Sequence, residues 1–350
     1  MKVYLVDIYL ANNLGDDMFL DHLAKSFPNT VFVPFYPGNK YDDFFQQYKN
    51  IRKFRYNLFD KICTRLGTAN KLQDYKAMAK KYDGVLFIGG GIFREESYWK
   101  SVFDYRSAIT DAFKAQKKEA HLIGSNFGPF YSSEFKDLHH DLFSKFTSAS
   151  FRDLKSYSLF SSIPHVSYAP DVLWDFNLPA VKTDNKTVGI SIIDPNHKSG
   201  LENYLERYVT AHKNVVLEYL KNGYKVKLFS FCETEGDLKV ANEIASVASE
   251  QIEVCNYDRN IQKFLVEFGS CSEIIAARFH AVTIAMKFKI PVLPVIYGDK
   301  TRNLLEDLNF RNAIIEFDNL QDIKMIDTQN YIKPELTTFI ERANQHFNFI

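Results

Sequence analysis

Long hydrophobic runs, paired cysteines and a surplus of either charge are all absent from this 350-residue sequence. No run reaches the roughly 18 apolar residues of a membrane-spanning helix, so none is predicted. The four cysteines form no Cys-x-x-Cys pair and have no histidine nearby at zinc-ligand spacing, which favours reduced core thiols in the cytoplasm. Lys plus Arg equals Asp plus Glu, at 43 each, so an anionic ligand must be held by a local cluster of cations.

Glycine and proline are modest, at 15 and 11 residues, while 46% of the chain is hydrophobic, as expected of a protein that forms a core. The 31 Phe and 20 Tyr predict large aromatic cores or stacking surfaces that a sugar could use. The apolar start, Met1–Asn13, is interrupted by Asp7 and followed by no small-residue cleavage site. It therefore predicts a first β-strand rather than a signal peptide.

Short apolar, β-branched runs alternate with longer amphipathic stretches along the chain. The runs that predict buried strands are Val3–Ile8, Val31–Phe35, Gly84–Ile88, Ala120–Ile123, Thr187–Ile193, Lys225–Phe231, Glu273–Ala276 and Val292–Ile296. Stretches such as Tyr204–Lys221 and Ile261–Phe268 have apolar residues at helical spacing. This alternation predicts an α/β fold with parallel sheets and helices on both faces.

The polar stretch Pro179–Lys186 interrupts this pattern near the middle of the chain. We expect two Rossmann-like domains that face each other across a cleft. Their predicted bounds are residues 1–180 and 186–332, with a C-terminal helix over residues 333–350.

A polar loop follows the first predicted strand. It contains Asn13, Gly15 and Asp16 and leads into a helix predicted over Met18–Ser26. Gly15 suits a tight turn and Asp16 suits a helix cap, so the loop is either a capped turn or a contact to a ligand.

Two further loops follow the third and fourth predicted strands. Gly89, Gly90 and Gly91 allow close approach of a ligand to the backbone, but the pattern is not Gly-x-Gly-x-x-Gly, which disfavours a nicotinamide-nucleotide site. Ser125 and Asn126 lie in the second loop. Because ligands bind beyond the carboxyl ends of parallel strands, we expect both loops to border the cleft.

Two charged residues of the first half are candidates for the same region. Arg152 follows a short apolar segment and is either a surface arginine paired with Asp153 or a guanidinium fork for a carboxylate or phosphate. Asp171 is either a turn or cap residue or a carboxylate of the cleft.

The strongest local pattern in the second half is Arg278-Phe279-His280, between a predicted strand and an apolar helix. An arginine, a titratable histidine and the free amides of a helix N-terminus there predict an anion site. Lys300 follows the next predicted strand, with Arg302 close by, and is a further candidate cation.

Other patterns favour no chemistry by themselves. His139 and His140 are adjacent on a predicted helix, so they point apart, and we expect a solvated face rather than a metal site. No motif predicts a metal. The segment Tyr41–Arg65 interleaves aromatic and basic residues, which suits either a membrane-facing surface or an aromatic-lined, partly exposed helix pair.

The ordered set of motifs resembles the polysaccharide pyruvyl transferase family over roughly residues 1 to 310. The matching motifs are Asn13-Leu14-Gly15-Asp16, Gly89-Gly90-Gly91, Gly128-Pro129, Arg152-Asp153 with Ser156, Pro170-Asp171, Arg278-Phe279-His280 with Ala285 and Pro291, and Tyr297–Lys300. The stretch Gly124–Gly128 departs from the family, in which a Gly-Gln-Gly-like stretch is more usual.

The resemblance implies a GT-B-like pair of Rossmann-like domains, with the acceptor on the N-terminal side and the donor on the C-terminal side. It implies phosphoenolpyruvate as co-substrate without a further cofactor. The acceptor would be a sugar of a bacterial surface polysaccharide, whether exopolysaccharide or capsule, or its lipid-linked precursor. Arg152, Arg278 and His280 would bind the donor together with Lys300, and Arg278 and His280 would be catalytic.

A second interpretation remains open, a GT-B glycosyltransferase that uses a nucleotide sugar. Glu233 or Glu235 after the Lys225–Phe231 run would then bind the ribose hydroxyls. For either enzyme we expect a cytoplasmic protein with a glycan or lipid-linked acceptor and no nucleic acid. Residues 41–65 are the candidate contact with the inner face of the membrane.

Overall fold

The computed structural model describes residues 1–36, 38–55 and 74–350, and their contacts divide into two compact units. Unit 1 comprises Met1–Leu10, Phe19–Val172 and Arg342–Ile350. Unit 2 comprises Ala11–Met18 and Leu173–Glu341. Each unit therefore includes a short segment that is distant in sequence from the rest of that unit. The sequence predicts a continuous range of residues for each domain.

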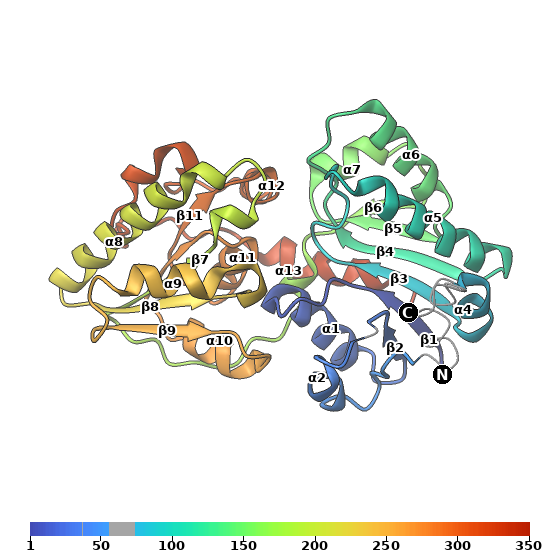
Figure 1. The fold of residues 1–350 in the computed structure, drawn as a ribbon, viewed down its shortest axis with the longest axis horizontal. Helices are drawn as coiled ribbons and strands as arrows, with labels where there is room; N and C mark the ends of the chain where they lie inside the picture. The colour runs from blue at the N-terminus through green and yellow to red at the C-terminus, as the bar shows by residue number, and fades with distance from the viewer. Residues whose placement is uncertain (37, 56–73) are drawn as a thin grey trace, which may run out of the picture. The chain divides into compact units, whose positions relative to one another are not determined.

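Unit 1 is built on a six-stranded parallel sheet with the order β2-β1-β3-β4-β5-β6 (Figure 1). Its strands are β1 (Val3–Asp7), β2 (Val31–Pro34), β3 (Gly84–Ile88), β4 (Glu119–Ser125), β5 (Ser148–Phe151) and β6 (Val166–Tyr168). Its helices include α2 (Asp42–Gln46), α4 (Tyr75–Lys81), α5 (Trp99–Ala115), α6 (Ser133–Ser144) and α7 (Leu154–Phe160). Two helices, α1 (Leu14–Ser26) and α13 (Thr337–Ala343), carry residues of both units.

Helices cover both faces of the unit 1 sheet. Phe87 of β3, Phe113 of α5 and Phe143 of α6 belong to one buried cluster. Because side chains alternate along a strand, Tyr4 of β1 and its neighbours on that side face the other way. The C-terminal residues pack on that face, where the Phe349 ring lies 6.3 Å from the Tyr4 ring between centroids.

Unit 2 repeats this architecture with the strand order β12-β11-β10-β7-β8-β9 (Figure 1). The strands are β7 (Thr187–Ile192), β8 (Lys225–Ser230), β9 (Ile252–Asn256), β10 (Glu273–Ala276), β11 (Val292–Ile296) and β12 (Ile315–Glu316). The helices are α8 (Leu205–Lys221), α9 (Asp237–Ala245), α10 (Ile261–Gly269), α11 (Phe279–Lys287) and α12 (Asp299–Asp307).

Adjacent residues of β8 show how unit 2 is layered. Leu228 belongs to the core formed with α8 and α9. Phe229 points to the opposite face, where its ring lies 5.4 Å from the Phe264 ring of α10. The sheet is thus buried on both faces, which is why its strands appear in the sequence as continuous apolar runs.

The predicted α/β class with parallel sheets is confirmed, and all eight predicted strands are present. Four strands were not predicted: β5, β6, β9 and β12. Two of these are very short, with three residues in β6 and two in β12. The edge strand β9 is only partly buried. Neither a very short strand nor a partly buried one shows the continuous apolar run from which the other strands were predicted.

The prediction of a solvated face at His139 is wrong. His139 is 3% exposed and lies on the buried face of α6 with Phe135, one helical turn away. Its Nδ1 lies 2.7 Å from the Phe135 carbonyl oxygen. Burial lowers the pKa of His139 to about 4, so the ring is neutral at neutral pH.

The membrane-facing interpretation of residues 41–65 is not supported by the part that the structure describes. The rings of Tyr41, Phe44, Phe45 and Phe54 are all buried. They are therefore not available to a bilayer, and residues 56–65 lie outside the described residues. In the described ranges no helix combines the length and hydropathy that crossing a membrane requires.

Candidate functional site

In unit 1, Arg152 emerges from the end of β5 into a buried polar cluster. Its side chain is 2% exposed, so the alternative of a surface arginine is wrong. The Nη1 atom donates to Asp171 Oδ2 at 2.7 Å, and Nε donates to Asn126 Oδ1 at 2.6 Å. Asp171 is likewise buried, so the two opposite charges leave water together.

Asn126 is itself oriented by the start of α7. Asp153 caps that helix by accepting from the Ser156 amide at 2.8 Å, and it also accepts from the Asn126 side-chain amide. The nitrogen of Asn126 therefore faces Asp153 and its oxygen faces Arg152. The cap explains why this arginine is followed by Asp153 and Ser156 in the sequence.

The glycine loop after β3 packs directly against the same arginine. A Cβ atom at Gly90 would lie 2.3 Å from both Nη atoms of Arg152. The Gly90 carbonyl accepts from the Asn126 amide at 2.6 Å, and the Gly89 carbonyl accepts from Ser125 Oγ. The two loops predicted to lie together are thus joined by hydrogen bonds around Arg152.

Gly90→Ala is expected to destabilise the protein by about 1–3 kcal/mol, the usual cost of overpacking, because the methyl group would displace a buried guanidinium. Gly91→Ala is the matched control, since its Cβ would meet only Arg94 Cδ at 3.9 Å. Urea unfolding of both variants measures the difference. Equal stability of the two variants would show that Arg152 does not lie against Gly90.

One member of this cluster, His346, could not be found from the sequence. The residue belongs to the short helix η7 (Asn344–Phe347) and is 3% exposed. Burial lowers its pKa to about 4, so the ring is neutral and Nε2–H donates to the Pro170 carbonyl at 2.7 Å. Nδ1 lies 2.7 Å from Ser150 Oγ. The chain end thereby contacts the residues that shortly precede Arg152 and Asp171 in the sequence.

In unit 2, Arg278 lies between β10 and α11 and is held by two carboxylates. Nε donates to Asp237 Oδ2 at 2.9 Å, Nη1 donates to Glu235 Oε2 at 2.7 Å, and Nη2 also donates to Asp237. Arg278 is 7% exposed and Asp237 is fully buried. These bonds use three of the five N–H groups of a guanidinium, and the other two have no partner among the described residues.

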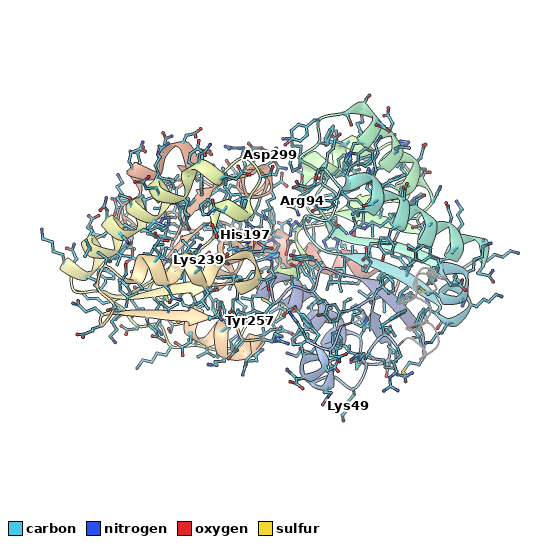
Figure 2. The ribbon with its side chains drawn as sticks, in the orientation of Figure 1. Lys49, Arg94, His197, Lys239, Tyr257 and Asp299 are labelled. Atoms are coloured by element: carbon cyan, nitrogen blue, oxygen red, sulfur yellow. The ribbon has the colours of Figure 1, made fainter. Side chains whose placement is uncertain are left out.

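A second cation, Lys198, contacts one of the two carboxylates that hold Arg278. Lys198, which follows the short helix η3 (Pro195–His197), forms an ion pair with Glu235; Figure 2 labels its neighbour His197. Burial alone would raise the pKa of Glu235, but Arg278 and Lys198 lower it far below its ordinary value. Lys300 of α12 adds a third cation, with its Nζ 5.4 Å from the centre of the Tyr297 ring. Neither Lys198 nor Asp237 was a candidate from the sequence.

His280 lies in the first turn of α11, and the start of α1 packs against it. A Cβ atom at Gly15 would lie 1.6 Å from His280 Nδ1, so only glycine fits at this position with the ring in place. The segment is fixed by backbone bonds to the end of β8, because the Leu14 amide donates to the Phe231 carbonyl at 3.0 Å. Asn13 and Gly15 therefore belong with His280 in unit 2.

The prediction that Asp16 caps this helix is wrong. The helix begins at Leu14, four residues earlier than predicted, and Asp16 lies inside it. Asn13 takes the capping position, because its Oδ1 accepts from the Gly15 amide at 3.1 Å. Asp17, the residue after Asp16, accepts a hydrogen bond of 2.8 Å from the Tyr257 hydroxyl; Tyr257 is labelled in Figure 2.

The predicted site residues thus form one cluster in unit 1 and two contacting pairs in unit 2. Unit 1 brings together Gly89, Gly90, Ser125, Asn126, Arg152 and Asp171. Unit 2 brings together Gly15 with His280, and Arg278 with Glu235. It stays a prediction that residues of both units bind one ligand. No three His, Cys, Asp or Glu side chains of the described ranges lie together as a metal site requires.

The sequence profile of the polysaccharide pyruvyl transferase family matches residues 13–299. The chain belongs to this family. The match begins at the Asn13–Gly15 segment and ends at Asp299, so it includes every candidate residue except Lys300. The amylovoran biosynthesis protein AmsJ of Erwinia amylovora is 22% identical over 387 aligned residues, which cover 94% of this chain and 91% of AmsJ.

Solved structures of similar fold include HepE of Anabaena in complex with UDP-glucose. HepE is 11% identical with a TM-score of 0.60, and the match covers 99% of this chain and 96% of HepE. The UDP-GlcNAc 2-epimerase of Methanocaldococcus jannaschii is 10% identical with a TM-score of 0.56, covering 95% of each chain. At these identities the likeness shows the fold alone, an α/β pair of units of GT-B type.

Proposed function

We propose that this family member transfers the pyruvyl group of phosphoenolpyruvate to two hydroxyls of a sugar. The acceptor would be a bacterial exopolysaccharide or capsular glycan, or its lipid-linked precursor at the inner face of the cytoplasmic membrane. The family membership supports the transferase class. The name of AmsJ, an amylovoran biosynthesis protein, supports a polysaccharide as the product.

The observation that carries the donor assignment is the state of Arg278. Its two carboxylate partners hold the guanidinium rigidly, while two N–H groups remain without a partner among the described residues. Those groups can donate to a carboxylate or phosphate without first breaking an ion pair. The N-terminus of α11, where His280 lies, adds the partial positive charge that favours an anion.

The candidate residues can account for each proton and for the phosphate in this reaction. His280 delivers a proton to the methylene carbon of phosphoenolpyruvate, and the first sugar hydroxyl forms a C–O bond at the cationic centre that results. Phosphate then leaves, and the second hydroxyl closes the ketal ring. One hydroxyl proton restores His280 and the other leaves with phosphate. Arg278, Lys300 and Arg152 stabilise the donor's negative charge.

Transfer from a nucleotide sugar is less well supported by the structure. The carboxylate proposed for the ribose hydroxyls in that mechanism, Glu235, is engaged by Arg278 and Lys198. The other, Glu233, accepts a hydrogen bond of 3.0 Å from Asn256.

The deciding experiment offers the purified protein phosphoenolpyruvate or a panel of UDP-sugars with the same glycan and lipid-linked acceptors. We expect phosphate release that depends on acceptor, with the acceptor gaining the mass of one pyruvate less water. Turnover of a UDP-sugar without phosphate release from phosphoenolpyruvate would contradict the proposal.

Gly15→Ala is expected to lower turnover by about 10-fold or more, because the added methyl group must displace the His280 ring and a misplaced catalytic group costs about 100-fold per ångström. The gain in helix propensity, about 1 kcal/mol, offsets only part of the overpacking cost of about 1–3 kcal/mol, so urea unfolding is measured beside turnover. Gly298→Ala is the control, as its Cβ would meet no atom within 4 Å. Wild-type turnover of Gly15→Ala would contradict the role assigned to His280.

A further inference from the structure

Tyr297 has a buried hydroxyl that the rest of unit 2 does not satisfy. The residue follows β11, and β10, which leads to Arg278, is the parallel neighbour of that strand. Tyr297 Oη is inaccessible to solvent and has no hydrogen-bond partner within 3.5 Å among the described residues, and Lys300, whose hydrogen bonding affects its pKa, lies beyond that distance. A buried hydroxyl without a partner costs about 1–3 kcal/mol, so this position calls for an explanation.

The surroundings of this hydroxyl are cationic. Burial alone would raise the pKa of Tyr297, but Lys300, Lys198 and Arg278 together lower it to about 8. Tyr331 provides the comparison, because its hydroxyl is also buried without a partner in the described ranges. There burial raises the pKa to about 12.

The cations around Tyr297 come from three different segments of unit 2. Lys300 lies on α12, Lys198 follows η3, and Arg278 precedes α11. The negative groups nearby, Glu235 and Asp237, are already paired with Arg278. Two uncharged side chains also lie in this region: the Phe317 ring is 6.2 Å away between ring centres, and the Tyr208 hydroxyl accepts from the Ile193 amide.

We propose that the Tyr297 hydroxyl is a ligand-binding group, which donates a hydrogen bond to an anionic oxygen of the ligand held in unit 2 and takes up a proton as that ligand binds. The inference rests on the proposed function in taking phosphoenolpyruvate as the ligand. In the free protein the cations lower the pKa of the phenol, so part of it is phenolate near pH 8. A multiply charged anion offsets them, so the phenol regains its proton and becomes a donor.

The first test needs no ligand. Tyrosinate absorbance of the wild-type protein is expected to rise by one residue's worth between about pH 7 and about pH 9, well below the ordinary titration of tyrosine. Tyr297→Phe should abolish this rise, and Tyr331→Phe should leave it unchanged. A wild-type protein without the rise, or a rise that survives in Tyr297→Phe, overturns the proposal.

The second test adds an anion at about pH 8, where both forms of Tyr297 are present. Phosphoenolpyruvate should remove the tyrosinate signal, with uptake of protons from the buffer, and Tyr297→Phe should bind it about 10-fold or more weakly, the usual value of a hydrogen bond to a charged group. A response to inorganic phosphate but not to phosphoenolpyruvate supports the role of Tyr297 and counts against the proposed donor. No response to either anion overturns the inference.

Discussion

His280→Ala is expected to lower the turnover of phosphoenolpyruvate by at least about 100-fold, the usual contribution of a positioned acid or base. The imidazole lies in the first turn of α11 and packs against the backbone of Gly15, which fixes its position. The measurement is kcat for acceptor-dependent phosphate release. His140→Ala is the control, because that histidine is half-exposed on α6.

Arg278→Ala should show a loss of similar size for a different reason. The substitution removes the two N–H groups proposed to bind the anion. It also leaves the buried Asp237 carboxylate without the Arg278 guanidinium. Arg302→Ala removes an arginine of the same unit that pairs with Glu316 at the surface and should leave kcat near wild type. If both His280→Ala and Arg278→Ala keep near wild-type turnover with the right acceptor, the catalytic assignment is wrong.

Asp171→Ala is expected to destabilise the protein by about 3–5 kcal/mol, because it removes the carboxylate that pairs with the buried charge of Arg152. Urea unfolding monitored by circular dichroism measures this loss. Glu316→Ala breaks a much more exposed arginine–carboxylate pair and should cost less than about 1 kcal/mol.

A double variant separates the stability of this pair from its function. Arg152→Met combined with Asp171→Leu removes both charges, and apolar replacements of a buried pair are often close to neutral. We expect it to regain much of the stability that Asp171→Ala loses while binding phosphoenolpyruvate no better than Arg152→Met. Wild-type affinity in the double variant would show that Arg152 does not bind the donor. A stability equal to that of Asp171→Ala would show that the loss does not arise from the buried charge.

Local sequence was a good guide where a residue's surroundings are its own neighbours in the chain. Continuous apolar runs predicted β3, β10 and β11 to the residue, because strands buried on both faces need apolar side chains throughout. It failed for β12, where two residues are too few for any pattern. It also failed for His139, because the aromatic residues that surround this ring come from several elements.

The sequence alone determined the fold class and most candidate residues, because strand–helix alternation and the loops after strands depend on spacing along the chain. Only the tertiary structure decided the partners of those residues. It paired Arg152 with Asp171 and Arg278 with Asp237, placed His346 behind the first pair, and left the Tyr297 hydroxyl among cations. Charge interactions act through space, and these partners are 19 to 176 positions apart, too far for any local pattern to record.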